Sequence, residues 1–422
     1  MLKEVKEFVD ELPVQIKENT VYVINQPNPN TYTHNYFKYP CKFIPEIPRW
    51  AMRTYLKNDV MAPKVLDPFA GSGTTLLEAA LMGIESVGTE IDDVAKLLIK
   101  VKTTQLTQDE ITESRNFTER VIAEIDNGNY DTDDIILPEI NNLEHWFQPQ
   151  ILKDLGYLYA RIIQIENVDV RDFLLICMAC IIKKVSNCDD VSPKPYVSNR
   201  VIKTPPGVSK TFSDAVIRNL EGMSDMTNRQ LASVTVSGDA LHINAEDASI
   251  DIAITSPPYI NAFDYVRTLR LENLWLEMAT ENELRERKRL YLGTESIKTR
   301  EEIKNLSILD ESSLLRTYFV KIREVDEKRA LIMKKFFEDM KKNLEEVYRV
   351  LKPGTKYVIV IGNSSIRKVD VESWKVIKDI ALNLGYNYCA HIGYEIQNPY
   401  IRIPRGNKGG KIAIDHVLVI EK

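Results

Sequence analysis

The chain has 422 residues, of which 44% are apolar and 27% charged, a composition typical of a globular protein with a sizeable core. The longest apolar run, 173–182, is too short to span a bilayer, no signal-peptide core opens the chain, and five cysteines favour reduced thiols over a disulfide framework. The net charge is −6, but residues 105–144 hold eleven acidic residues against two basic ones, so the rest of the chain is net positive. We therefore expect a cytoplasmic protein that does not enter a membrane, and the charge excludes no nucleic-acid partner.

The first clear structural unit begins at Lys64, after an aromatic, proline-broken segment (31–50) and a helix expected over 47–57. A short apolar strand at 65–66 leads into a glycine-rich turn, a helix follows, and a second strand covers 86–89. In such a strand–loop–helix–strand unit the strands are parallel, so the turn and the residue after the second strand meet at one edge of the sheet.

The glycine-rich turn carries the first chemical signal. Its sequence is Asp67-Pro-Phe-Ala-Gly71-Ser-Gly73-Thr-Thr75. The glycines allow a ligand to approach the backbone at a helix N-terminus, but no lysine follows them, which argues against a triphosphate site. Asp67 would repel a pyrophosphate and favour a cation, whereas Glu90 stands where an acid accepts ribose hydroxyls. A nucleoside with a cationic tail fits both, and S-adenosylmethionine is such a ligand.

The chain then changes character. Helical periodicity predicts helices at about 108–126, 149–165 and 169–185, and a basic, proline-rich stretch covers 183–210. Strand patterns return at 234–237 and 250–255, a charged helical insert covers about 265–347, and strands close the chain at 357–361, 386–393 and 412–420. The last two strands predict an antiparallel pair added to a parallel sheet.

The second chemical signal follows the strand at 250–255 and reads Thr255-Ser256-Pro257-Pro258-Tyr259. The prolines stiffen the loop and remove N–H donors, so the carbonyl oxygens there act as acceptors. An exocyclic amine of a nucleobase is a poor nucleophile; acceptors such as the Ser256 hydroxyl and the Pro257 carbonyl would grip its N–H groups and free its lone pair for attack on a methyl group. Tyr259 offers a stacking face for a base taken out of its helix.

The two loops together resemble the DNA amino-methyltransferases, which methylate cytosine N4 or adenine N6. The resemblance covers about 31–100 and 234–422, and includes Asp239 in the segment Ser237-Gly238-Asp239-Ala240. It implies a Rossmann-like α/β fold with a seven-stranded, mostly parallel sheet in the order 3-2-1-4-5-7-6, the last strand antiparallel. In the commonest branch of the family with a serine before Pro-Pro, the catalytic loop precedes the cofactor loop. Here the cofactor loop comes first, so the DNA-recognition region cannot be assigned by analogy.

The predicted organisation has three parts. Residues 1–100 form the N-terminal part of the catalytic domain, 101–233 a helical insert and candidate DNA-recognition region, and 234–422 the C-terminal part with its own insert at about 265–347. The predicted cofactor-binding residues are Asp67, Phe69, Gly71, Gly73, Thr74, Glu90 and Asp239. The predicted catalytic residues are Ser256, Pro257, Pro258 and Tyr259.

The residue before Pro-Pro leaves the target base open. Thr-Ser-Pro-Pro-Tyr resembles the loop of the cytosine-N4 enzymes, whereas Asp or Asn before Pro-Pro is the usual adenine-N6 pattern. We therefore prefer cytosine N4 as the methylated position. Carbon-5 methylation needs a thiolate, and Cys41, the only cysteine after a proline, lies before the cofactor loop. Two further alternatives are a methyltransferase acting on RNA bases and a non-catalytic DNA-binding subunit.

Basic segments at 183–210, at 285–304 and in the closing loop are candidates for contacts with phosphates of double-stranded DNA. The named candidates are Lys183, Lys184, Lys194, Tyr196, Arg200, Lys203, Arg402 and Arg405. Cys177, Cys180 and Cys188 are expected to pack in a core rather than to bind metal, because a structural zinc site needs four ligands. A restriction endonuclease is a possible partner that only the resemblance implies, and the sequence does not indicate the oligomeric state.

Overall fold

The computed structural model describes residues 6–25, 31–40, 42–57, 60–128, 130–200, 202–226, 229–260, 264–397 and 413–422. Within these ranges, no helix combines the length and the apolar character that crossing a membrane requires. Cys41 and the predicted DNA-contacting Arg402 and Arg405 lie outside the described residues.

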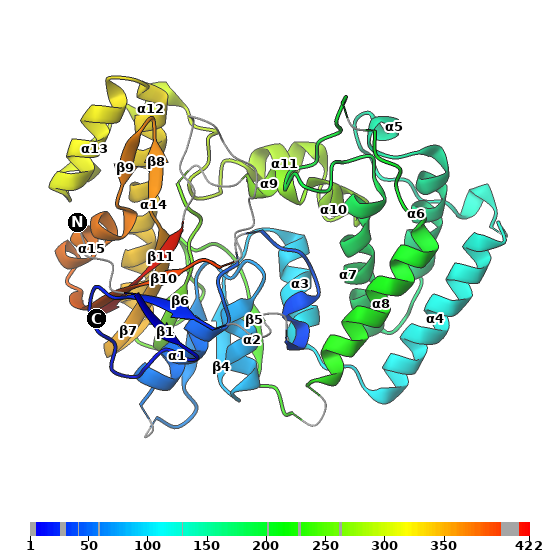
Figure 1. The fold of residues 1–422 in the computed structure, drawn as a ribbon, viewed down its shortest axis with the longest axis horizontal. Helices are drawn as coiled ribbons and strands as arrows, with labels where there is room; N and C mark the ends of the chain where they lie inside the picture. Colours follow the sequence, from blue (N-terminus) through cyan, green and yellow to red (C-terminus); the bar gives the residue numbers. More distant parts are fainter. Residues whose placement is uncertain are drawn as a thin grey trace.

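A nine-stranded sheet runs through the molecule in the order β1-β2-β10-β11-β7-β6-β3-β4-β5 (Figure 1). Only β11 runs against its neighbours, β7 and β10, and the other neighbouring pairs of this sheet are parallel. The strands are β1 (Lys6–Val9), β2 (Val21–Ile24), β3 (Lys64–Asp67), β4 (Glu85–Gly88), β5 (Val234–Val236), β6 (Ile250–Thr255), β7 (Leu351–Gly362), β10 (Asn387–Glu395) and β11 (Ile414–Glu421).

Seven of these strands, β5-β4-β3-β6-β7-β11-β10, follow the expected order and direction, so the predicted α/β class and its antiparallel last strand are confirmed. The predicted strand number is wrong, because β1 and β2 extend the sheet to nine strands. β2 (VYVI) pairs with β10 at Val21↔Gly393 and Tyr22↔Tyr394 and covers an edge that β10 would otherwise expose. A glycine suits position 393 in this pairing, because a Cβ there would lie only 2.9 Å from Ile414 Cγ2.

The central strands are buried on both faces, and alternate residues pack in clusters with different helices. Ile252 and Ile254 of β6 belong to the same hydrophobic cluster as Trp50 of α1 (Glu46–Tyr55). Ala253 belongs to a second cluster with residues of α14 (Glu327–Val350) and α15 (Ser373–Asn383), such as Phe336. The predicted helix at 47–57 corresponds to α1.

A third hydrophobic cluster builds a helical region beside the sheet, on the right of Figure 1. Its helices are α4 (Gln108–Asp126), α5 (Leu143–Trp146), α6 (Pro149–Ile162), α7 (Val168–Val185) and α8 (Val208–Ser224). The three helices predicted from periodicity correspond to α4, α6 and α7. α4 begins with a capping box between Thr107 and Glu110, and the side chain of Asn167 caps α7.

The charged segment at about 265–347, predicted as one helical insert, divides between two hydrophobic clusters. Residues of α9 (Tyr265–Thr268), α10 (Arg270–Trp275) and α11 (Glu281–Arg287) join the helical cluster. By contrast, residues of α13 (Ser313–Arg323) and α14 join the cluster on the sheet, as do partly buried residues near the short α12 (Thr299–Glu302). A small hairpin, β8 (Ser364–Ile366) and β9 (Val369–Val371), follows β7. The domain boundaries proposed from sequence stay a prediction.

Candidate active site

The glycine-rich loop turns the chain from β3 into α2 (Thr74–Leu81) with two left-handed residues, Gly71 (φ +51°) and Gly73 (φ +74°). A Cβ on Gly73 would also lie 2.8 Å from Ile99 Cγ1 of α3 (Asp93–Thr103). A larger residue is therefore excluded twice at position 73, by backbone conformation and by space. These two glycines bring the loop close to the start of α2.

Glu90 joins this loop to the end of β4. One carboxyl oxygen accepts the N–H of Gly71 at 3.0 Å, and the other accepts the N–H groups of Ile91 and Asp92 at 2.8 Å each. Burial raises the pKa of Glu90 to about 8, against the lowering effect of these three donors. The carboxyl group is thus fixed in orientation with lone pairs left over for a ligand.

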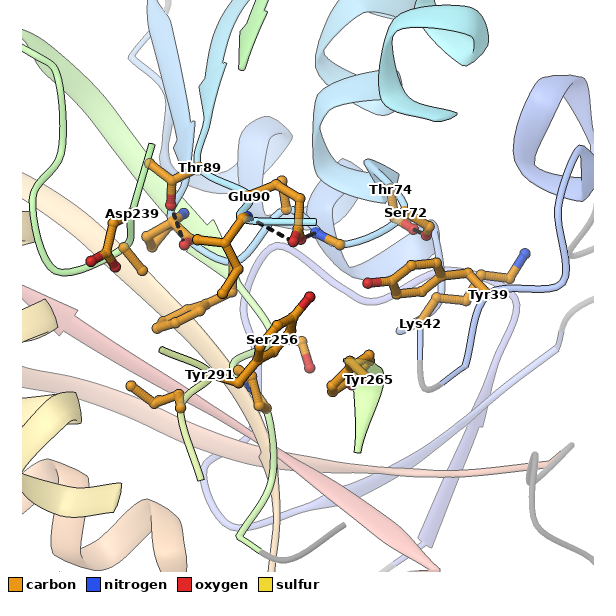
Figure 2. Close-up of a pocket in the computed structure, with 18 of the residues that line it drawn as sticks. Tyr39, Lys42, Ser72, Thr74, Thr89, Glu90, Asp239, Ser256, Tyr265 and Tyr291 are labelled. Atoms are coloured by element: carbon orange, nitrogen blue, oxygen red, sulfur yellow. Dashed lines mark hydrogen bonds between the residues drawn. The ribbon is translucent and has the colours of Figure 1, made fainter. Parts of the chain in front are cut away.

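The catalytic loop predicted from sequence and the glycine-rich loop line one pocket. Ser256 and Pro258 contribute to its wall together with Gly71, Glu90 and Asp239 (Figure 2). The space between these walls measures about 780 Å³, a volume that includes the part open to solvent. Of the predicted cofactor-binding residues, the lining includes Phe69, Gly71, Thr74, Glu90 and Asp239.

Asp67 and Gly73 are not among the lining residues. Asp67 is fully buried at the end of β3, where Oδ1 accepts the Thr255 hydroxyl at 2.6 Å and the Phe69 N–H at 3.1 Å. Its Oδ2 has no hydrogen-bond partner among the described residues, and burial raises the pKa of this carboxyl to about 6. The acid expected to face a cationic ligand instead joins the ends of β3 and β6.

Pro257 and Tyr259 also lie outside the pocket lining. Tyr259 is partly exposed, and its hydroxyl donates to Asp415 Oδ1 at 2.8 Å. Asp415 on β11 was not a sequence candidate, although with His416 it interrupts an apolar strand pattern, which is a usable signal.

Three tyrosine rings in the pocket wall were also missed from sequence. Tyr39 stacks with Tyr265 (centroids 6.0 Å apart), and Tyr265 stacks with Tyr291 (6.1 Å). They come from three distant segments, so no local pattern predicts their meeting. Lys42, beside Tyr39 in Figure 2, lines the pocket as well; its ammonium donates to the His34 carbonyl at 2.8 Å, and burial lowers its pKa to about 8.

The predicted DNA-contacting residues of the 183–210 stretch differ in their exposure and in their hydrogen-bond and ion-pair partners. The Lys183 ammonium donates to the Ser192 carbonyl and its pKa is lowered by burial, and the Lys203 ammonium pairs with Asp190 at 2.6 Å. Lys184, Tyr196 and Arg200 are exposed, and Lys194 is half-buried.

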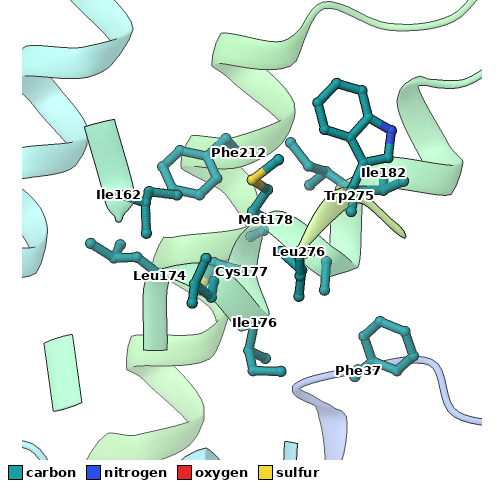
Figure 3. Packing of buried hydrophobic residues seen from close by; sticks show 14 of the residues in the cluster. Phe37, Ile162, Leu174, Ile176, Cys177, Met178, Ile182, Phe212, Trp275 and Leu276 are labelled. Carbon is teal, nitrogen blue, oxygen red and sulfur yellow. The ribbon is translucent and has the colours of Figure 1, made fainter. Parts of the chain in front are cut away.

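Cys177 lies among apolar side chains of the helical cluster, close to Met178 and Leu174 (Figure 3). Cys188 is equally buried, and Cys180 is partly exposed. The packing expected for Cys177 and Cys188 is therefore observed. Among the described residues, no group of three or more His, Cys, Asp or Glu side chains is arranged to hold a metal ion.

The pocket chemistry fits S-adenosylmethionine better than a phosphate-bearing ligand. Two carboxyl groups, Glu90 and Asp239, can accept hydroxyl or amine donors of a nucleoside, while Phe69 and Leu241 provide apolar surface.

Comparisons with known sequences find similarity to DNA methyltransferases. A family model described as DNA methylase matches residues 4–101. The chain is 26% identical to the Type II methyltransferase M.MvaI of Kocuria varians, over 95% of this chain and 92% of that protein. It is 23% identical to the Type II methyltransferase M.AvaI of Nostoc sp. (strain PCC 7120 / SAG 25.82 / UTEX 2576), over 90% of this chain and 84% of the relative.

Among solved structures, a SAM-dependent methyltransferase from Methanosarcina mazei matches with a TM-score of 0.30 and 10% identity, covering 86% of this chain and 95% of that one. At that TM-score the structural likeness carries no conclusion. The family model, the related sequences and the sheet order agree with the resemblance drawn from the two loops. Residues 4–101 thus match the DNA methylase model and most of the chain is similar to Type II methyltransferases, which supports the resemblance to the S-adenosylmethionine-dependent DNA amino-methyltransferases.

Proposed function

We propose that this protein transfers a methyl group from S-adenosylmethionine to the exocyclic amine of a base in double-stranded DNA, and that the base is cytosine, methylated at N4. One observation supports this most directly: Ser256 and Pro258 of the catalytic loop line the same pocket as Gly71 and Glu90 of the cofactor loop. A gripped amine and a methyl donor held at these two loops would be within reach of each other.

Each side chain has a separate task in this proposal. Glu90 accepts the ribose hydroxyls, Asp239 accepts the adenine amine, and Gly71 and Gly73 allow close approach of the backbone. Bound S-adenosylmethionine supplies the electrophilic methyl group. The Ser256 hydroxyl oxygen and the Pro257 carbonyl accept the two N–H groups of the target amine, which draws the nitrogen lone pair out of conjugation and aims it.

The target base must leave the duplex to reach the pocket, and the partly exposed Tyr259 ring offers a face against which it can stack. The exposed Lys184, Tyr196 and Arg200 of the 183–210 stretch are the proposed contacts with DNA. The relatives are named Type II methyltransferases. By analogy we propose that this chain protects DNA in a restriction–modification system, with a restriction endonuclease as its counterpart.

The test is expression in a bacterial host that lacks its own DNA methylases, followed by modification-sensitive sequencing and mass spectrometry of the nucleosides. We expect one methylated sequence motif that carries N4-methylcytosine, and no methylation with Ser256→Ala. N6-methyladenine at the motif would reassign the base, methylation confined to RNA would reassign the substrate, and cofactor binding without transfer would make the chain a non-catalytic subunit.

A further inference from the structure

A buried carboxylate on α2 joins three segments of the chain. Glu78 is 2% exposed and is not among the residues that line the pocket. Its two oxygens accept the Arg49 guanidinium of α1 in a fork, with both N–O distances at 2.9 Å. Its Oε1 also lies 2.9 Å from Nε2 of His34, which belongs to the short 3-10 helix Tyr32–Asn35. Glu78 therefore links α2 both to α1 and to the segment that precedes α1.

The charges of the two partners fix the direction of the bond to His34. Burial acts to raise the pKa of Glu78, but the hydrogen bonds from His34 and Arg49 outweigh it and hold that pKa below its usual value. Burial lowers the pKa of His34 to about 4, so the ring is neutral at pH 7. Because a carboxylate only accepts hydrogen bonds, His34 carries its proton on Nε2 and donates it to Glu78. Nδ1 has no hydrogen-bond partner among the described residues, so the ring is held through Glu78.

The backbone of His34 is tied in turn to the pocket wall. The Lys42 ammonium donates to the His34 carbonyl at 2.8 Å, and Tyr39 lies between these two residues in the sequence. The Tyr39 ring packs against the cofactor loop, since a Cβ added to Gly71 would lie only 3.3 Å from Tyr39 Cε1. The same ring stacks with Tyr265, which follows the catalytic loop. Tyr39 thus contacts both the cofactor loop and the segment after the catalytic loop.

Thr33, the neighbour of His34, fastens the same stretch to α3. Its hydroxyl donates to the Lys102 carbonyl at 2.8 Å, and the Lys102 ammonium donates to the Ser72 carbonyl of the cofactor loop at 2.6 Å. Two consecutive residues are therefore held by the two helices next to the cofactor loop, Thr33 by α3 and His34 by α2. This double attachment fixes where the chain toward Tyr39 begins.

We propose that Glu78 is a positioning residue for cofactor binding: through its bond with His34 it holds Tyr39 against Gly71 and so maintains the wall of the cofactor pocket. The inference rests on the proposed function, because it takes S-adenosylmethionine as the ligand, and it deepens that function by giving a role to a side chain outside the pocket. The effect of Glu78 should appear in the affinity for the cofactor and not in the transfer step at saturating cofactor.

The first test compares Glu78→Gln with Asp251→Asn, a matched control. Asp251 is 6% exposed and also joins three segments, because from β6 it accepts the Lys64 N–H of β3 at 2.9 Å and the Lys352 ammonium of β7 at 2.7 Å. It stands near the start of β6, whereas the two loops follow the ends of β3 and β6. Both variants replace a buried carboxylate by an amide, so both should lower the thermal midpoint.

Only Glu78→Gln should weaken the binding of S-adenosylmethionine, by about tenfold in the Kd measured by calorimetry. The glutamine amide cannot accept both Arg49 and His34 as the carboxylate does, so the His34 ring loses its place. A Kd in Glu78→Gln equal to that in Asp251→Asn would overturn the proposal.

A second pair of variants leaves the Glu78–Arg49 fork intact. His34→Leu removes the donor to Glu78, whereas His34→Gln supplies an amide N–H for the same bond. We expect the Kd for S-adenosylmethionine to rise about tenfold in His34→Leu and to return to within about threefold of the wild type in His34→Gln. The kcat at saturating cofactor should stay within about twofold in both. Equal Kd values in the two His34 variants would contradict the proposal, since a hydrogen bond to Glu78 would then make no difference.

The route through Tyr39 is tested in a double variant. Tyr39→Leu removes the ring from Gly71, so Glu78→Gln should cost at most about twofold more affinity in that background, against about tenfold in the wild type. Losses that multiply in full would show that Glu78 acts by another route and would overturn the proposal. Calorimetry on the wild type keeps the two hypotheses apart: a wild type that does not bind S-adenosylmethionine overturns the proposed function itself. A wild type that binds it, with variants that bind it equally well, overturns only the role of Glu78.

Discussion

The hydroxyl of Thr255, the last residue of β6, donates a 2.6 Å hydrogen bond to Asp67 Oδ1 at the end of β3. These residues stand at the starts of the cofactor loop and the catalytic loop, so this short bond adds a side-chain link between the two loops to the backbone pairing of β3 with β6. Both side chains are fully buried, and a hydrogen bond to a charged group in such a place is among the stronger ones.

Thr255→Val keeps the shape of the side chain and removes the donor. We expect a loss of about 1–3 kcal/mol in the free energy of unfolding, because the buried Asp67 carboxylate loses a partner. Urea unfolding measures this loss, and calorimetry should show weaker cofactor binding. Thr235→Val on β5 is the control, since that side chain is exposed. Unchanged stability in Thr255→Val would contradict the role given to this bond.

Glu90→Gln should weaken the binding of S-adenosylmethionine by about 10- to 100-fold. Both oxygens of Glu90 accept backbone N–H groups, so the amide nitrogen of glutamine has to face a donor and the loop must shift. Calorimetric titration measures the effect. Glu85→Gln, exposed at the start of the same strand, is the matched control and should bind the cofactor as the wild type does.

Lys102 is almost fully buried on α3, and its ammonium donates to the Ser72 carbonyl of the cofactor loop at 2.6 Å. Burial holds its pKa well below the usual range for lysine. Lys102→Met keeps the length but removes the donor, and we expect about tenfold weaker cofactor binding. Lys100→Met, on the same helix but paired with Asp169 and Asp172, should leave binding unchanged. Equal affinities in the two variants would argue against a role for Lys102 in shaping the loop.

Much of the architecture follows from local pattern. The glycine-rich loop, Glu90 and the Thr255-to-Tyr259 loop are short motifs at strand ends, and parallel strands bring their carboxyl ends to one edge, so their meeting could be predicted. The tyrosines at 39, 265 and 291 could not, because their stacking depends on how three distant segments pack. β1 and β2 were missed because four-residue strands in a charged N-terminal region leave little periodic signal.

Asp67 shows why a residue can be placed correctly and its contacts misjudged. The sequence puts a carboxylate at the end of β3, which is where it lies, but it does not reveal that Thr255 and the Phe69 N–H occupy one of its oxygens. Whether a strand-end acid faces the ligand or the neighbouring strand depends on one side-chain torsion. Sequence patterns carry no information about that angle.

Two histidines, His391 of β10 and His416 of β11, form a hydrogen-bonded pair on the last two strands. His391 Nε2 lies 3.0 Å from His416 Nδ1, His391 Nδ1 lies 3.1 Å from Asn19 Oδ1, and His416 Nε2 lies 3.0 Å from Asn363 Nδ2. One arrangement satisfies all three contacts: both rings are neutral, each carries its proton on Nδ1, and His416 donates to His391. Trp374 stacks on His391 with centroids 3.6 Å apart.

Burial lowers the pKa of His391 to about 3 and that of His416 to about 4. In the unfolded chain these groups bind protons near pH 6.5, so the unfolded state holds more protons between about pH 4 and 6.5, and the free energy of unfolding should fall as the pH is lowered through that window.

His391→Gln removes one such group. We expect the stability difference between wild type and variant to shrink by on the order of 2 kcal/mol from pH 7 to pH 4.5, measured by urea unfolding at each pH. His242→Gln, at an exposed side chain, should show no such trend. A difference that stays constant across the window would show that folding does not lower the pKa of His391, and it would contradict the neutral pair inferred from the contacts with Asn19, His416 and Asn363.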